Sequence, residues 1–379
     1  MTEGGEQVEE VGDLNAYTRI AQKVEEQEPH TAPKAPDGSI HEAFIGHLKL
    51  VYSPEEAEVV QHLNHLEAFT STQEVAEASG RSLEDVETIL AAVHARSGVV
   101  GLCNMYCLPP IPMLVNIHQF YPEVRDGDVE AAQLYQEYFI KDGFSRHYES
   151  SDKGTPMARI IPIDRAIEAK QEVLAAEEAH DYILNHSAEE LALVPCPCRT
   201  RTEKLNIREC KDEFPVAACI MMGAAALHFE GIGLGKRVTK QQAVKYFDEM
   251  QDLGLVGQTF NARAGEMVIC LCCGCCCSQV RGRTKWGNPD ALSPSNFVPR
   301  PGEDCIRCET CTDRCFFGAI TLNEETDEIE VDVEKCIGCG VCTLACTQES
   351  LKLHRYERST TFDTPQKLLE TVARENRGG

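Results

Sequence analysis

Two runs, CIRCETCTDRC at 305–315 and CIGCGVCTLAC at 336–346, share one cysteine spacing, C-x2-C-x2-C-x3-C. Three closely spaced thiolates followed by a fourth suit a [4Fe–4S] cluster. Structural zinc is the alternative, because pairs of C-x2-C also suit a tetrahedral zinc ion. Zinc needs only two such pairs, so it leaves the third and fourth cysteines of each run unexplained. We therefore expect two iron–sulfur clusters in this part of the chain.

The two runs resemble the bacterial-type 2[4Fe–4S] ferredoxin module, over residues 296–355. In that family the fourth cysteine of each run ligates the cluster of the other run. The resemblance implies one cluster on Cys305, Cys308, Cys311 and Cys346, and a second on Cys336, Cys339, Cys342 and Cys315. One departure is visible: the family usually has proline after each fourth cysteine, where this chain has Phe316 and Thr347. The local turn is therefore expected to differ from that of the family.

Ten further cysteines lie in the middle of the chain, within VPCPCR at 194–199, at two single positions, and within ICLCCGCCC at 269–277. They are Cys196, Cys198, Cys210, Cys219, Cys270, Cys272, Cys273, Cys275, Cys276 and Cys277. We expect one or two additional clusters here, with the first four cysteines on one cluster and the 270–277 run on another; a mixed assignment remains open. In an extended run, alternate residues face opposite sides, which would put Cys273, Cys275 and Cys277 opposite Cys270, Cys272 and Cys276. Zinc or a set of reduced thiols is the alternative.

Residues 40–112 have the pattern of a winged helix. Ser53 and Ser71 each precede a glutamate by three residues, as in capping boxes, and Ser82 precedes Asp85 likewise. Residues 99–107 would form the wing strand. Acidic residues stand where a recognition helix would meet DNA, at Glu84, Asp85 and Glu87, so we expect a role in protein contact or in packing rather than DNA binding.

With these motifs the whole chain resembles multidomain 4Fe–4S dicluster proteins of anaerobes. The predicted fold class is α+β multidomain, with a winged-helix-like N-terminal domain, a cysteine-rich central α+β domain and a C-terminal 2[4Fe–4S] ferredoxin-like domain. The predicted segments are an acidic arm and linker at 1–39, the winged-helix-like domain at 40–115, the central domain at 116–295, the ferredoxin domain at 296–355 and a terminal helix at 356–379. Within them we expect helices from residue 13, near 129–141, near 166–186 and at 220–229, and a strand at 158–163.

Other polar motifs favour structural roles. Glu177 and His180 have the spacing of a di-iron carboxylate motif, but the second copy that such a site needs is missing. His62 and His65 lack the glutamate of a metalloprotease motif. Both pairs are predicted to lie on solvated helix faces. Cys103 and Cys107 are predicted to be buried or incidental thiols rather than ligands.

Composition limits the environment and the partners. The formal net charge is −25, which disfavours nucleic acid and anionic membranes and favours a basic partner surface. The crowded cysteine pairs cannot form a sensible set of disulfides. The acidic first ten residues do not resemble a signal peptide, and no apolar run is long enough for a membrane span. We therefore expect a cytoplasmic protein of a reducing, anaerobic cell.

The favoured function is electron transfer: single low-potential electrons pass through the ferredoxin-type clusters and the additional clusters to a partner oxidoreductase. No organic cofactor motif and no catalytic residues stand out. Two other classes remain open. One is a reductase in which a central cluster has an open iron site. The other is a redox-sensing regulator in which the cluster state controls the winged helix.

Overall fold

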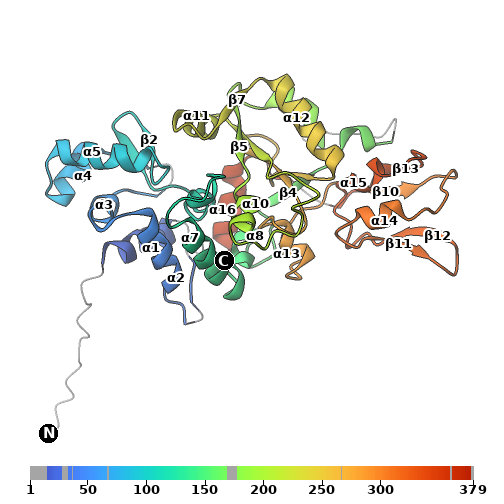
Figure 1. Ribbon diagram of the computed structural model, residues 1–379, viewed down its shortest axis with the longest axis horizontal. Coiled ribbons are helices and arrows are strands. Elements are labelled where there is room, and N and C mark those ends of the chain that lie inside the picture. The colour runs from blue at the N-terminus through green and yellow to red at the C-terminus, as the bar shows by residue number, and fades with distance from the viewer. Residues whose placement is uncertain are drawn as a thin grey trace, which may run out of the picture. The chain divides into compact units, whose positions relative to one another are not determined.

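The computed structural model describes residues 15–27, 33–35, 37–65, 68–168, 177–265, 267–358 and 361–376. The chain forms two compact units, Met1–Leu114 and Val115–Gly379, and each is considered by itself. Figure 1 shows helices in the first unit, and strands with helices around them in the second. The mixture of helix and sheet predicted from the sequence is confirmed. None of the described helices is long and apolar enough to cross a membrane.

The first unit combines six helices and a small three-stranded sheet within its described residues. The helices are α1 (Ala16–Gln27), α2 (Glu42–Val51), α3 (Pro54–Val60), α4 (Thr72–Ser79), α5 (Leu83–His94) and α6 (Ile111–Leu114). The strands β1 (Thr70–Ser71), β2 (Val100–Leu102) and β3 (Met105–Cys107) pair antiparallel in the order β1-β3-β2. The core is apolar, with Phe44, Leu63 and Leu90 fully buried.

The expected helix starts of this unit are present. Ser53 and Ser71 form capping boxes with Glu56 and Glu74, and the Ser82 side chain accepts a hydrogen bond from the Asp85 amide. The wing prediction needs correction, because residues 99–107 form the hairpin β2–β3 and not one strand. Residues 13 and 14, at the predicted start of the first helix, lie outside the described residues. Residues 28–32 and 36 of the predicted linker also lie outside them.

The second unit is built on a six-stranded antiparallel sheet in the order β4-β8-β9-β6-β5-β7. Its strands are β4 (Ala158–Ile161), β5 (Leu191–Pro195), β6 (Ala218–Met222), β7 (Lys236–Val238), β8 (Val256–Phe260) and β9 (Val268–Cys272). The central helices are α7 (Asp128–Tyr135), α8 (Phe144–Glu149), α9 (Ala179–Asp181), α10 (Pro197–Lys204), α11 (Ala224–Gly231), α12 (Lys240–Leu253) and α13 (Val280–Thr284). One 3-10 turn covers Ile117–Gln119 and another Asp164–Ala166, while Gln136–Lys141 and Tyr182–His186 are π-helical. Thr239 caps α12 with Gln242, as its sequence indicates.

Two helix predictions in this unit fail in part. The segment at 218–222 is strand β6, because it pairs with β5 on one side and β9 on the other, and such tertiary pairing overrides an apolar run's local preference. The helix begins only after Gly223, whose φ of 56° breaks the extended run. The predicted helix near 166–186 is helical over 179–186, whereas Ile167 is in a β-bridge; residues 169–176 lie outside the described residues.

The C-terminal part packs onto the central sheet. Strands β10 (Phe297–Pro301) and β13 (Leu351–Arg355) pair antiparallel, as do β11 (Ile320–Asn323) and β12 (Glu328–Val331). Short helices α14 (Thr310–Arg314) and α15 (Val341–Leu344) lie between the strands in sequence. Val280 and Val256 of the central part share one hydrophobic core with Ile337 and Leu353. The last helix, α16 (Pro365–Asn376), buries Leu368, as the terminal-helix prediction requires.

Candidate iron–sulfur and metal centres

Two cavities in the C-terminal part are lined by the cysteines of the two runs. Cys305, Cys308, Cys311 and Cys346 line one cavity. Cys315, Cys336, Cys339 and Cys342 line the other. Each cavity therefore combines three cysteines of one run with the fourth cysteine of the other run, which is the grouping that the ferredoxin resemblance implies. Strand β10 precedes the first run and pairs with β13, which follows the second run, so this pairing brings the two runs together.

Phe316, which replaces the family's proline, forms part of the wall of the second cavity. Its ring lies 4.7 Å from that of Phe317, measured between centroids. Phe316 also approaches Gly274 in the central cysteine run, where a Cβ atom would lie 2.7 Å from the ring. The aromatic residue thus connects the second cavity with the central cysteines, and glycine at 274 makes this close approach possible.

The central sheet brings together cysteines that are far apart in the sequence. In the β5–β6 register Val194 lies opposite Cys219, and in the β8–β9 register Val256 lies opposite Cys272. Cys196 follows β5 directly and is the N-cap residue of α10. Strand β9 ends at Cys272 and the chain then turns through residues 274–276. Ten cysteines consequently gather at one end of the sheet, in two distinct groups.

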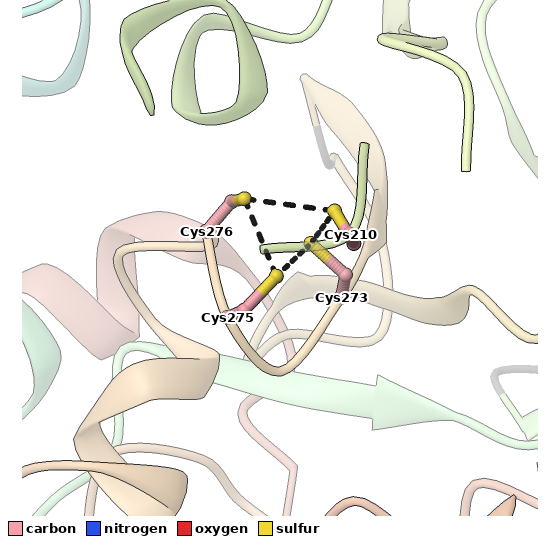
Figure 2. A group of neighbouring side chains, drawn as sticks. All are labelled: Cys210, Cys273, Cys275 and Cys276. Atoms are coloured by element: carbon pink, nitrogen blue, oxygen red, sulfur yellow. Dashed lines mark hydrogen bonds between the residues drawn. The ribbon is translucent and has the colours of Figure 1, made fainter. Parts of the chain in front are cut away.

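The first group is a closed set of four, Cys210, Cys273, Cys275 and Cys276, shown in Figure 2. All four sulfur atoms lie within 4.8 Å of one another. The Sγ of Cys210 is 3.7 Å from those of Cys273 and Cys276. The Sγ of Cys275 is 3.8 Å from that of Cys273 and 3.4 Å from that of Cys276. We call this group the tetrad.

The second group is a ring of six thiols in which the pKa of each one is shifted by the side chains of two neighbouring thiols. Around the ring the order is Cys196, Cys198, Cys277, Cys272, Cys270 and Cys219, which closes on Cys196. We call this group the hexad. Its thiols come from the segment after β5, from β6, and from β9 with the turn that follows. Four of its residues are buried, and Cys198 and Cys270 are half-buried.

This grouping differs from two sequence expectations. The favoured partition placed Cys210 with Cys196, Cys198 and Cys219, but Cys210 lies in the tetrad, so the thiols are grouped in a mixed arrangement. Strict alternation along 270–277 also fails. It holds through β9, where Cys270 and Cys272 lie in one hydrophobic core and Cys273 in another. The turn at residues 274–276 then ends the extended conformation in which alternate side chains face opposite sides.

Two buried arginines flank the central cysteines. Arg199 and Arg201 are 1% and 0% exposed. The Nη1 of Arg199 donates to the Leu271 carbonyl at 2.9 Å and lies 4.0 Å from the Sγ of Cys273. Burial opposes the charge on Arg199, but the thiolates of Cys196 and Cys273 outweigh it and keep the pKa raised. Because a buried cation needs an anionic partner, these arginines favour charged thiolates over neutral thiols.

Arg201 is held firmly beside the hexad. Its Nη1 donates to Asn116 Oδ1 at 2.7 Å, and its Nη2 donates to Ser278 Oγ at 2.9 Å. The guanidinium lies 3.5 Å from the centre of the Tyr135 ring. Ser278 Oγ is also 3.5 Å from the Cys198 thiol. The position of Arg201 beside the hexad was not predicted from the sequence. The signal that could have indicated it is the arginine that follows closely after the C-x-C pair.

A buried ion network holds the other end of α10. The Asp128 carboxylate is bonded to His118 Nδ1 at 2.9 Å, Lys204 Nζ at 2.7 Å and Arg125 Nη2 at 3.2 Å. Burial alone would raise the pKa of Asp128, but these hydrogen bonds outweigh it and hold the pKa well below its usual range. Burial lowers the pKa of Lys204 despite the pairing. Because Lys204 Nζ lies 2.7 Å from the Asp128 carboxylate, we take both groups to be charged at neutral pH.

The remaining candidate pairs do not form ligand sets. The Glu177 carboxylate pairs with Arg355, and His180 Nε2 is 2.8 Å from Asp248 Oδ1, so the prediction of a solvated helix face fails for Glu177. His65 is buried, contrary to the same expectation. Cys103 is exposed and Cys107 is buried. Burial raises the pKa of the Cys107 thiol to about 11.

Comparison with known proteins gives partial matches. The chain is similar to the archaeal-type glutamate synthase [NADPH] of Thermotoga maritima, with 28% identity over 91 residues, covering 23% of this chain and 18% of the relative. It is similar to the polyferredoxin-like subunit of the aliphatic sulfonate oxidoreductase of Pyrococcus furiosus, with 34% identity over 83 residues, covering 20% of this chain and 47% of the relative. A third relative is a subunit of the ion-translocating oxidoreductase complex of Methanosarcina acetivorans, with 43% identity over 49 residues, covering 13% of this chain and 18% of the relative.

The chain thus spans less than half the length of these curated relatives. No solved structure matches it. Residues 304–350 match the family described as the 4Fe–4S dicluster domain. This segment contains both cysteine runs and both sets of cysteines that line the cavities described above. The chain therefore contains a 4Fe–4S dicluster domain towards its C-terminal end.

Proposed function

We propose that the protein transfers single low-potential electrons to or from a partner oxidoreductase, through two ferredoxin-type clusters and at least one further cluster at the hexad. The observation that carries the proposal is the pair of cavities, each lined by three cysteines of one run and the fourth cysteine of the other. Four thiolates around one cavity are the donor set of a [4Fe–4S] cluster, which accepts and releases one electron at a time.

The ligand roles follow the cavities. We assign Cys305, Cys308, Cys311 and Cys346 to one cluster, and Cys315, Cys336, Cys339 and Cys342 to the other. The first set is the more exposed, since Cys308 is exposed and its three partners are half-buried, whereas Cys336 and Cys342 are buried. We therefore propose that electrons pass between the partner and the chain at the first set.

A third cluster fits the hexad for reasons of charge and burial. The hexad offers six thiols, which is more than the four that one [4Fe–4S] cluster uses. As neutral thiols they would leave the buried guanidinium of Arg201, which Ser278 links to the Cys198 thiol, without an anion. Cys270, Cys272 and Cys277 of the hexad share one hydrophobic core with Cys339 of the second cavity. This shared core supplies a short path between the two sites.

The partner is proposed from the relatives. Two of the three compared proteins carry names that describe subunits of oxidoreductases. The exposed first cavity and the net charge of −25 favour a basic docking surface on that partner. A cytoplasmic location is proposed with it, because thiolate ligands persist in reducing compartments.

Iron and acid-labile sulfide analysis of anaerobically purified protein, with EPR of the reduced form, tests the proposal. We expect about twelve irons per chain if the hexad holds a four-iron cluster, and more if it holds a larger one. Cys311→Ser should remove one ferredoxin-type signal, and Cys272→Ser should remove the hexad signal alone. The exposed Cys103→Ser is the control. A value of about eight irons, unchanged by Cys272→Ser, would contradict the third cluster.

The first unit is proposed to be a winged-helix module for protein contact. The sheet order β1-β3-β2 and the helix pair α4–α5 support this topology. Glu84 and Asp85 are exposed at the start of α5, where phosphates would have to approach in a DNA complex. Fluorescence anisotropy with duplex DNA at low salt should show no binding. Salt-dependent binding would instead support the regulator hypothesis.

A further inference from the structure

The tetrad differs from every other cysteine group in how closely its sulfur atoms approach. A tetrahedral zinc ion with Zn–S bonds of about 2.3 Å places its four sulfur atoms about 3.8 Å apart. The four sulfur–sulfur separations given above for the tetrad range from 3.4 to 3.8 Å. Figure 2 shows three of these side chains on one tight turn, with Cys210 reaching them from another segment. The dimensions are those of a site for one ion.

A [4Fe–4S] cluster requires a different arrangement. Four irons and four sulfides lie between its thiolates, so the ligand sulfur atoms must stand well apart around the core. Within the described part of the chain, the tetrad is the one group of three or more possible ligand atoms that all lie within 4.8 Å of one another. The ferredoxin-type cysteines instead surround cavities, and the six thiols of the hexad do not form such a compact group.

The surroundings of the tetrad suit thiolates that share a divalent ion. Thr202 Oγ1 donates a hydrogen bond to the Cys276 sulfur at 3.1 Å. Burial opposes the charge of the Arg208 side chain, which is 5% exposed, but the neighbouring Cys210 sulfur and Glu203 outweigh it and raise the Arg208 pKa. Four thiolates with one divalent ion carry two negative charges, which the guanidiniums of Arg208 and Arg199 balance. Such donors orient and neutralise metal-bound sulfur.

We propose that the tetrad binds a single zinc ion through Cys210, Cys273, Cys275 and Cys276. A closed four-thiolate tetrahedron is the usual structural zinc site, and zinc exceeds ferrous iron in affinity for such donors. The ion links the segment after α10 to the turn after β9. Zinc has no accessible redox change, so the site holds the cysteine-rich end together and takes no part in electron transfer. The proposal is independent of the proposed function.

The open side of the tetrad indicates how the ion enters and which variant tests it. Cys210, Cys273 and Cys276 are at most 4% exposed, whereas Cys275 is half-buried. Replacing Cys275 by histidine keeps a zinc ligand at the accessible corner, because three cysteines and one histidine also form structural zinc sites. Cys210→Ser, by contrast, removes the ligand that comes from the distant segment.

Elemental analysis and zinc-edge X-ray absorption of the full chain provide the test. We expect about one zinc per chain, with four sulfur neighbours at about 2.3 Å. Cys210→Ser should lose the zinc and keep the iron content and EPR signals. Cys275→His should retain the zinc with three sulfur neighbours and one nitrogen, even if the serine variant folds poorly. Cys103→Ser is the control and should retain all metals.

Two results would overturn the proposal. If Cys210→Ser lost four irons and their EPR signal, the tetrad would be a cluster site. If the protein bound about one extra iron with the EPR signal of an isolated ferric ion after oxidation, and no zinc, the site would be an iron site. Failure of the electron-transfer proposal would appear separately, as a low iron and sulfide content with the zinc intact.

Discussion

The ferredoxin-type cysteines and the central cysteines contrast in how the chain brings them together. Each ferredoxin cavity takes three cysteines from seven consecutive residues and one from the other run. The hexad takes its thiols from three segments spread over 196–277, joined by the pairing of β5 with β6 and of β6 with β9. The first arrangement is local in sequence, and the second exists only when the sheet is formed.

The difference shows what each region needs for its stability. Six of the eight ferredoxin-type cysteines are half-buried or exposed, whereas Cys336 and Cys342 are buried. The central part buries Arg199 and Arg201 beside its thiols and holds α10 with an internal ion network. The ligation that we propose for the central thiols would therefore depend on these buried charges. Substitutions away from the cysteines can test this dependence.

The largest effect is expected for Asp128→Asn. The change removes the anion facing Lys204 and His118 and leaves a buried cation unpaired, which costs about 3–5 kcal/mol of unfolding free energy. In the wild type the stabilisation is present above the ordinary carboxyl pKa and is lost as the pH falls below about 4, since the folded pKa lies below the unfolded one. Chemical denaturation at several pH values measures both effects.

The control is Asp363→Asn, which removes the exposed ion pair with Lys367 and should leave the unfolding curve unchanged. If Asp128→Asn lost the ferredoxin EPR signals before the hexad signal, the contrast between the two regions would be wrong. Equal stability of the variant and wild type would mean that the network does not support α10.

A smaller effect of opposite sign is expected for Glu149→Gln. Glu149 is fully buried and accepts a hydrogen bond from Asn288 at 2.8 Å, and burial raises its pKa to about 8. The folded state therefore keeps a proton that the unfolded state releases above about pH 4.5, so wild-type stability falls as the pH rises to about 8. The glutamine variant should be more stable by about 3 kcal/mol at pH 7 and lack this slope.

Thermal unfolding from pH 5 to pH 8 would show the two curves converging at the acid end. Glu330→Gln, on the exposed face of β12, serves as the comparison and should follow the wild type throughout. Parallel curves for Glu149→Gln and wild type would mean that Glu149 is ionised in the folded protein.

The smallest effect is expected for Gly274→Ala, at the contact between the two regions. The added methyl group would lie 2.7 Å from the Phe316 ring, and such overpacking costs about 1–3 kcal/mol. The displaced ring also lines the second cavity, so the EPR signal assigned to Cys336, Cys339 and Cys342 should shift while the signal of the first set does not. The double variant Gly274→Ala/Phe316→Leu should recover stability. If it does not, the destabilisation caused by Gly274→Ala does not come from the contact with Phe316.

The sequence predicted the local features of this molecule well and the tertiary ones poorly. Ser53 and Ser71 cap helices as expected, because capping depends on residues three apart. The two sets of cysteines around the ferredoxin cavities follow from the resemblance. The split into tetrad and hexad could not be predicted, because it depends on β6 pairing with two strands and on the turn after Cys272.

A cluster at the hexad, as proposed above, would also set an order for maturation of the protein. Its last cysteine, Cys277, is made 81 residues after its first, Cys196, so no shorter nascent chain can present the complete ligand set. Four of its six thiols are buried once the sheet has formed. If the hexad holds the cluster proposed above, delivery of that cluster must coincide with closure of β9 onto β6, whereas a cluster on the more exposed Cys305 set can be loaded on an already folded chain. The hexad should consequently be the slower of the two sites to reconstitute.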